Sequence, residues 1–260
     1  MNTFSYILDR TEVLFRKIEQ WKSRKALARK TSMWSALETY HSKTKSTGCS
    51  YIDYYELYKA IRRDKPTEVL ECGTGVTTLI IAHAMMENEQ ETGVKGRVTS
   101  MEEIGEWMEM SRNLLATEYH PYVDFCLSDT VDDYISLFRG VRYRDIPKRD
   151  YDFVFVDGPK YSSPLDGVPT FDFDYIYAVM NSNKPVSAII DKRVSTVFVL
   201  QQVLGVKKVK YSPIKGLGFV SSCTKKDLGE LSRDLSSTNF LKSFKLFGRT
   251  VLGLSPLSRG

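Results

Sequence analysis

The apolar positions of this chain show two different kinds of spacing. From Thr67 onward, short apolar runs of strand length are separated by segments with apolar residues at helical spacing. Such alternation is typical of a parallel sheet with helices on both faces. We expect five parallel strands at 68–71, 97–101, 123–127, 151–156 and 186–190, with helices near 77–89, 105–118, 131–138, 171–180 and 195–204. Segments 207–211 and 217–222, which enclose Pro213 and Gly216, predict a closing hairpin.

The first 30 residues predict a basic amphipathic helix. Basic residues fill the positions between apolar residues that recur roughly at helical spacing, namely Phe4, Ile7, Leu8, Leu14, Phe15, Ile18 and Trp21. This helix can pack on the domain and leave its charged face in water. Alternatively, residues 2–30 can contact a membrane surface or an acidic partner. Two further helices, at 33–42 and 52–63, lead to the first strand.

The pattern divides the chain into three regions. A basic helical extension covers 1–50, an α/β core covers 51–224, and a basic tail covers 225–260. The tail is rich in Ser, Lys and Leu but weakly periodic, so it predicts a short helix followed by a loosely held segment.

The composition argues against a membrane-spanning, a secreted and a nucleic-acid-binding protein. The 260 residues are 42% hydrophobic, which is enough for one sizeable core. The chain has no run of about 18 apolar residues that would predict a transmembrane helix, and its start lacks a signal-peptide pattern. Four cysteines stand far apart without metal-site or disulfide spacing, which favours a reducing, cytoplasmic setting. The formal net charge is +5, but no nucleic-acid-binding motif accompanies it, so we expect no specific nucleic-acid partner.

The segment Glu71-Cys72-Gly73-Thr74-Gly75 joins the first expected strand to a helix. An acid and two glycines at such a turn let the backbone approach a bound ligand closely. Thr78 stands where a dinucleotide-binding loop would carry its third glycine. A carboxylate here would repel a pyrophosphate but would suit a positively charged nucleoside with free hydroxyls. An ordinary glycine-rich turn without a cofactor is the alternative reading of this motif.

This motif resembles the cofactor loop of the class I S-adenosylmethionine-dependent methyltransferases. The resemblance extends over about residues 50 to 222 through motifs at successive strand ends. It implies an α/β fold with a Rossmann-like, doubly wound, mostly parallel seven-stranded sheet that ends in an antiparallel hairpin. It also implies S-adenosylmethionine as cofactor, bound through Glu71, Gly73, Thr74, Gly75 and Thr78.

The second and third strands add acidic residues at the same edge of the sheet. Glu102 and Glu103 follow the second strand, where a carboxylate can accept hydrogen bonds from both ribose hydroxyls, and the resemblance favours Glu102. Both acids can instead stabilise the start of the next helix. After the third strand, the resemblance implies that Asp129 binds the adenine amino group, with the backbone of Ser128 nearby. Asp129 can equally cap the helix expected at 131–138.

The fourth strand ends in Asp157-Gly158-Pro159-Lys160, so Asp157 should project into the crevice at the strand ends. The segment resembles the catechol- and caffeoyl-type O-methyltransferases. In that group the Asp binds a divalent metal and the Lys serves as general base, which would give these roles to Asp157 and Lys160. Asp157 would also line the cofactor site.

The fifth strand matches the same group only in part. Asp191 stands where the resemblance places a second metal ligand, but Lys192 replaces a neutral oxygen ligand with a cation. A hard ion such as Mg²⁺ takes about six oxygen ligands, and an ammonium beside it is unfavourable. Three readings stay open: a metal bound by Asp157 and Asp191, a metal-free catalytic site that includes Lys160 and Lys192, and structural ion pairs.

Together these motifs predict a methyltransferase that acts on a hydroxyl of a small molecule or sugar. An amide clamp of the kind that nitrogen methylators carry is missing after the fourth strand, which favours an oxygen acceptor. The alternative is a degenerate Rossmann-like binding module that acts through its basic N-terminal helix.

Overall fold

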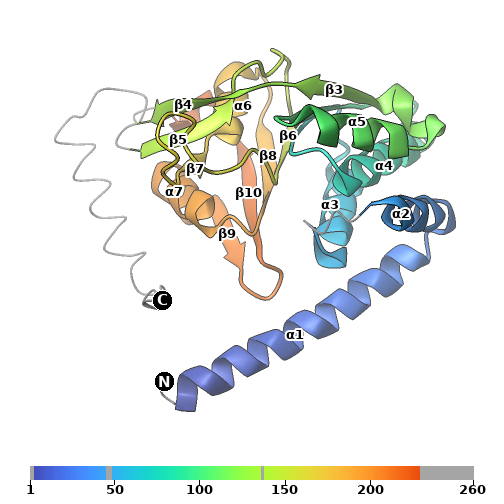
Figure 1. The fold of residues 1–260 in the computed structure, drawn as a ribbon, viewed down its shortest axis with the longest axis horizontal. Helices are drawn as coiled ribbons and strands as arrows, with labels where there is room; N and C mark the ends of the chain where they lie inside the picture. Colours follow the sequence, from blue (N-terminus) through green and yellow to red (C-terminus); the bar gives the residue numbers. More distant parts are fainter. Residues whose placement is uncertain (1–2, 45–48, 136–137, 229–260) are drawn as a thin grey trace.

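The fold is built on a seven-stranded sheet with helices on both faces (Figure 1). The computed structural model describes residues 3–44, 49–135 and 138–228. The strand order is β3 (Val123–Leu127), β2 (Arg97–Glu102), β1 (Glu68–Cys72), β6 (Phe153–Val156), β8 (Val186–Asp191), β10 (Leu217–Cys223) and β9 (Val209–Ser212). The first five strands in this order are parallel, and β10 is antiparallel to both of its neighbours. The α/β fold, the parallel strands and the closing hairpin are therefore confirmed.

Apolar side chains on both sides of the central strands hold the helices to the sheet. Val69 and Leu70 of β1 are both fully buried, but they belong to different core clusters because successive strand residues face opposite sides. One side carries α3 (Tyr51–Asp64), α4 (Val76–Thr92), α5 (Gly105–Leu114) and the 3₁₀ turn η1 (Thr117–Tyr122). The other side carries α6 (Asp174–Asn181), α7 (Val194–Leu204) and the short α8 (Lys225–Leu228). The rest of the predicted tail lies outside the described residues.

The helix predicted at 131–138 is wrong. Instead β4 (Thr130–Ile135) and β5 (Phe138–Tyr143) form an antiparallel pair, and the short β7 (Phe171–Asp172) joins β5 in a second, three-stranded sheet. Apolar residues at 131, 134, 135 and 138 fit a helical period as well, which explains the error. Ion pairs between the two strands stabilise this sheet, since the guanidiniums of Arg139 and Arg142 lie 2.6 Å from the carboxylates of Asp132 and Asp133.

Two N-terminal helices, α1 (Thr3–Ala28) and α2 (Thr31–Lys43), precede the core. Helix α2 buries Met33, Leu37 and Tyr40, and the Tyr40 hydroxyl lies 2.8 Å from Ser111 Oγ of α5. Helix α1 runs along the outside of the molecule (Figure 1). The side of α1 that carries Gln20, Ser23 and Leu27 packs on the domain, so this part of the first alternative is confirmed. The apolar side chains of Leu14, Phe15, Ile18 and Trp21 are exposed, and contact with a membrane surface or an acidic partner stays a prediction. Among the described residues, no helix has both the length and the apolar character needed to cross a bilayer.

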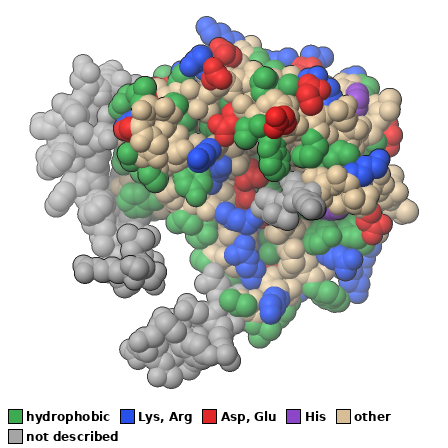
Figure 2. Space-filling model, viewed as in Figure 1, with side chains coloured by type: hydrophobic (Ala, Val, Ile, Leu, Met, Phe, Trp, Pro, Cys, Tyr) green, Lys and Arg blue, Asp and Glu red, His purple; other side chains and the backbone are tan. Residues whose placement is uncertain are grey.

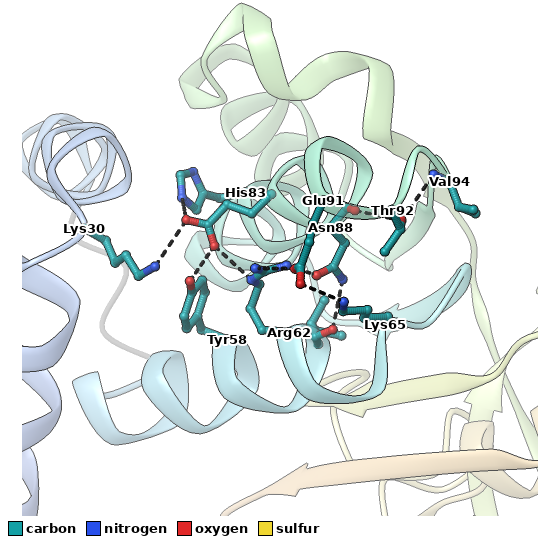
Figure 3. Close-up of polar contacts among 11 residues, drawn as sticks. Lys30, Tyr58, Arg62, Lys65, His83, Asn88, Glu91, Thr92 and Val94 are labelled. Atoms are coloured by element: carbon teal, nitrogen blue, oxygen red, sulfur yellow. Dashed lines mark hydrogen bonds and ion pairs between the residues drawn. The ribbon is translucent and has the colours of Figure 1, made fainter.

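A polar network fixes the junction of α1 and α2 to α3 and α4 (Figure 3). Its centre is Glu87, which lies 3.4 Å from Lys30 Nζ and 3.0 Å from Arg62 Nε and accepts a hydrogen bond from the Tyr58 hydroxyl. Arg62 also reaches Glu91 at 2.9 Å. These charge-assisted bonds therefore add polar contacts between α3 and α4 to their packing in the apolar core.

The turns after β1 and β6 touch through their backbones. Gly73 has φ +94°, and a Cβ there would lie 2.9 Å from Gly158 N. A Cβ on Gly158 would lie 2.7 Å from Gly73 N and 2.8 Å from the Tyr143 hydroxyl oxygen. The amides of Asp157 and Gly158 both donate to the Cys72 carbonyl, at 2.9 and 2.6 Å. Glycine is therefore required at both positions for the two loops to meet.

We expect Gly73→Ala to destabilise the protein more than Gly93→Ala. Both glycines have positive φ, but a Cβ on Gly93 would have nothing within 4 Å. The left-handed conformation alone costs about 1–2 kcal/mol for alanine, and the overlap at Gly73 adds roughly 1–3 kcal/mol. Urea unfolding of both variants measures the difference, and equal losses would show that the loops do not need this close contact.

Candidate functional site

The predicted site residues lie at one edge of the main sheet. They lie at or after the carboxyl ends of parallel strands, which meet at the same edge, and β1 and β6 flank the point where the strand order reverses. Three of these residues lie in the last two positions of a strand: Glu71 in β1, Glu102 in β2 and Asp191 in β8. The others follow a strand: Gly73, Thr74, Gly75 and Thr78 after β1, Ser128 and Asp129 after β3, Asp157 and Lys160 after β6, and Lys192 after β8.

Glu71 lies fully buried beneath the glycine loop. Its Oε2 accepts hydrogen bonds from the hydroxyls of Thr78 and Ser100, both at 2.6 Å. The Thr78 hydroxyl in turn accepts from Gly75 N at 3.1 Å, so the carboxyl group orders the loop from inside the fold. Burial raises the pKa of Glu71 to about 7, against the opposing effect of the Ser100 hydroxyl. A direct contact of Glu71 with a cofactor stays a prediction.

The open side of this loop faces Glu102. Glu102 Oε2 accepts from Thr74 N at 3.3 Å, while Oε1 accepts from the amides of Glu103 and Ile104 at 2.9 and 3.0 Å. A Cβ on Gly75 would meet nothing within 4 Å, so the backbone is uncovered there. Glu103 is directed elsewhere, since its Oε1 accepts from Lys160 N at 2.9 Å. Of the two acids at the end of β2, Glu102 is therefore the one that borders the glycine loop.

The residues after β3 are arranged differently from the expectation. Ser128 is buried, and its Oγ donates to the Asp129 carbonyl and accepts from Asp145 N, both at 2.9 Å. Ser128 N itself pairs with the Glu102 carbonyl at 2.9 Å. The Asp129 side chain is 77% exposed and pairs with Arg144 at 3.0 Å. Because β4 begins at Thr130, the alternative role of Asp129 as a helix cap is wrong, whereas its contact with adenine stays a prediction.

Asp157 belongs to a cluster of titratable groups that the sequence did not reveal in full. The Cys49 thiol donates to Asp157 Oδ2 at 3.1 Å and lies 3.8 Å from Asp191 Oδ2. Lys192 Nζ is 3.4 Å from Asp191 Oδ2 and 3.4 Å from Asp53 Oδ2. We call these five residues the acid cluster. Cys49 and Asp53 were missed because the segment Ser50-x-x-Asp53 indicates only a helix start, which is the local role that Asp53 also performs.

Burial and like charges govern protonation in the acid cluster. Burial raises the pKa of Asp191, and the carboxylates of Asp53 and Asp157 raise it further. Burial likewise raises the pKa of the Cys49 thiol well above its ordinary value, so Cys49 is a protonated donor. Burial lowers the pKa of Lys192, but the carboxylates of Asp53 and Asp191 outweigh this effect and raise it overall. A charged Lys192 is suited to stabilising negative charge rather than to accepting a proton.

Arg193, which no sequence motif singled out, supports the turn that carries Asp157. Its guanidinium donates to the carbonyls of Asp157 and of Pro159, the latter at 2.7 Å. It also pairs with the fully buried Asp172 at 2.5 Å. Burial raises the pKa of Asp172 to about 6, against the opposing charge of Arg193. Arg193 therefore ties the turn after β6 to β7 and α7.

The donor set of the acid cluster does not fit Mg²⁺. One ligand atom each from Cys49, Asp157 and Asp191 lies within 4.8 Å of the others. However, one of these atoms is the sulfur of a thiol, and the Lys192 ammonium lies 3.4 Å from the Asp191 carboxylate. Magnesium prefers oxygen ligands, and the ammonium already supplies the positive charge that the carboxylates need.

We expect the stability of the protein to report the protonation of Glu71. Its pKa rises from 4.5 to about 7 on folding, so its stabilising effect is full below pH 4.5 and is lost as the pH rises through 7. Relative to Glu71→Gln, the wild type should therefore lose about 2.5 kcal/mol of unfolding free energy between about pH 5 and pH 8. Urea unfolding at both pH values measures this, and the exposed Glu106→Gln serves as control. A constant difference between the wild type and Glu71→Gln would contradict the assignment.

Comparison with known proteins gives structural matches only. No family model matches the chain, and no curated protein matches it. The O-methyltransferase TomG from Streptomyces achromogenes, involved in tomaymycin synthesis and solved with SAM, is 15% identical with a TM-score of 0.45, over 74% of this chain and 90% of TomG. A methyltransferase from Geobacter sulfurreducens is 14% identical with a TM-score of 0.45, over 73% of this chain and 90% of that chain. An O-methyltransferase from Bacillus cereus, solved with SAH, is 15% identical with a TM-score of 0.39, over 72% of this chain and 74% of that chain. These matches report a similarity of overall structure only. The fold of this chain is assigned from its own strand order.

Proposed function

We propose that this chain is an S-adenosylmethionine-dependent methyltransferase that methylates a hydroxyl of a small molecule or sugar. The observation that carries the proposal is the position of Glu102. Its carboxylate is fixed by backbone amides at the end of β2 and lies beside the uncovered loop Thr74–Gly75. Three amides use three of the roughly four acceptor sites of this carboxylate, so one site on Oε2 remains for a ribose hydroxyl, and a second hydroxyl can bind where it replaces the 3.3 Å contact from Thr74 N.

The charge of this edge of the sheet favours the same cofactor. S-adenosylmethionine, when bound, supplies a methyl group on a positively charged sulfur. Burial and like charges raise the pKa of Asp191 to about 8, so Asp191 is largely protonated at neutral pH and the carboxylates of Asp53 and Asp157 lie near the single ammonium of Lys192. A negative edge attracts a sulfonium and repels the phosphates of a nicotinamide dinucleotide.

The acceptor chemistry requires alignment and removal of one proton. The acceptor hydroxyl must lose its proton as its oxygen takes the methyl group, and we assign the proton to the Asp157 carboxylate. Asp157 is half-buried, and its Oδ2 is oriented by the Cys49 thiol. Lys192 would stabilise the developing oxygen charge. Lys160 is the second candidate base; its side chain is exposed, and its backbone is held by Glu103.

A metal has no part in this proposal. The ammonium of Lys192 takes the place next to Asp191 where the resembling O-methyltransferases would have a neutral metal ligand. Positive charge near the acceptor oxygen is therefore supplied by a side chain of the protein.

We expect Glu102→Ala to weaken binding of S-adenosylmethionine by about tenfold to a hundredfold, because charge-assisted hydrogen bonds contribute roughly 1.5–3 kcal/mol. Isothermal titration calorimetry with the cofactor and its demethylated product measures this. Glu106→Ala, an exposed acid on α5, is the matched control and should bind as the wild type does. Unchanged affinity in Glu102→Ala would remove the ribose assignment. If the wild type bound neither ligand, the degenerate binding module would become the better reading.

We expect Asp157→Asn to lower methyl transfer by roughly a hundredfold or more, since a general base contributes about that factor, and to lower cofactor affinity much less, because only one of the charges near the sulfonium is lost. Transfer of labelled methyl to a panel of hydroxylated small molecules and sugars measures the rate. EDTA should leave the wild-type rate unchanged. Loss of transfer on chelation that Mg²⁺ restores would overturn the metal-free assignment, and loss in Lys160→Met alone would move the base to Lys160.

A further inference from the structure

Helix α1 turns its apolar side away from the protein. Leu14, Phe15, Ile18 and Trp21 are 58%, 48%, 38% and 61% exposed. Their spacing places them on one side of the helix, over roughly 10 Å of its length. We call these four residues the apolar stripe. Four large side chains exposed together on one helix differ from single scattered ones, which are normal on protein surfaces.

The side of α1 that faces the protein is more polar than the apolar stripe. Gln20 Oε1 accepts from Ile52 N of α3 at 3.3 Å, and Ser23 and Leu27 are buried. The Arg24 guanidinium lies 5.6 Å from the Trp34 ring and 5.8 Å from the Tyr51 ring. These contacts fix the rotation of α1 about its axis, so the stripe cannot turn inward without breaking them.

Positive charge surrounds the apolar stripe. Residues 13–30 contain seven Lys or Arg residues and one acid, Glu19. Lys17, Lys22, Lys25 and Arg29 are exposed, and Lys25 Nζ lies 5.0 Å from the centre of the Trp21 ring. Figure 2 shows green apolar and blue basic side chains mixed along the lower edge of the molecule, where α1 lies.

We propose that α1 binds the surface of a membrane that contains anionic lipids. A helix with Trp, Phe and Leu on one side and Lys or Arg beside them lies in the plane of the lipid interface, with its apolar side in the acyl region and its cations at the headgroups. This proposal is independent of the methyltransferase assignment, because none of its residues belongs to the site at the edge of the sheet.

Charge complementarity favours a lipid surface over the other occupants of the stripe. A second copy of this chain, paired by two-fold symmetry, would bring the two basic surroundings together. The segment 229–260 carries five Lys or Arg and two acids, so it too would add like charge. An anionic surface neutralises the cations and buries the stripe at once.

Sedimentation of the full-length protein with vesicles tests the proposal. We expect binding to vesicles of phosphatidylcholine and phosphatidylglycerol in equal parts, and weak or no binding to phosphatidylcholine alone. Ile18→Gln/Trp21→Gln should lower the bound fraction, and Lys22→Glu/Lys25→Glu should lower the partition constant roughly tenfold or more, with added salt acting in the same direction.

The control variant is Val206→Gln/Lys207→Glu, which changes an exposed apolar residue and an exposed cation after α7 and should bind vesicles as the wild type does. Circular dichroism and the unfolding midpoint verify that every variant is folded. Absence of binding to anionic vesicles, or equal binding by the wild type and both α1 variants, would overturn the proposal. A dimer in light scattering that the Ile18→Gln/Trp21→Gln variant alone abolishes would overturn it in favour of a second copy.

Discussion

The contact between the turns after β1 and β6 is the constraint on which the rest of the site depends. Gly73 and Gly158 bring two backbones together where the strand order reverses, and the Cys72 carbonyl binds both amides of the second turn. This contact sets the distance between the glycine loop, which borders Glu102, and Asp157, which belongs to the acid cluster. The cofactor side and the acceptor side of the proposed reaction are therefore positioned by backbone atoms, which are stiffer than side chains.

The acidic residues at the carboxyl edge of the main sheet have different roles, which depend on how each one is buried. Glu71 is enclosed and orders a loop, whereas Glu102 is held by three amides that leave one acceptor site on Oε2. Asp172 pairs with Arg193, while Asp53 and Asp191 share the one ammonium of Lys192 and burial keeps the pKa of Asp191 raised. The same functional group thus serves as support, ligand and counter-ion, and its surroundings decide which.

Local patterns predicted most of the fold but only part of the site. The central strands and the glycine loop were predicted because their apolar runs and turn residues are contiguous in sequence. The pair β4–β5 was not predicted, since Val131, Tyr134 and Ile135 also fit a helical repeat, and the backbone pairing and ion pairs that hold β4 join it to a different strand. Cys49 was missed because its partner Asp157 lies 108 residues away. The outward rotation of α1 could not be predicted either, because a periodic pattern shows which residues share a side but not which side meets the protein.

The acid cluster also restricts which amino-acid substitutions the chain tolerates at these positions. Removal of Lys192 would leave Asp53 and Asp191 buried without their cation, and removal of either acid would leave the ammonium partly uncompensated. Cys49 is bound to the same group through Asp157. Related chains should therefore alter these positions together, so that a neutral residue at 192 is accompanied by a changed residue at 49 or 53. The cluster thus couples side chains from three distant parts of the sequence.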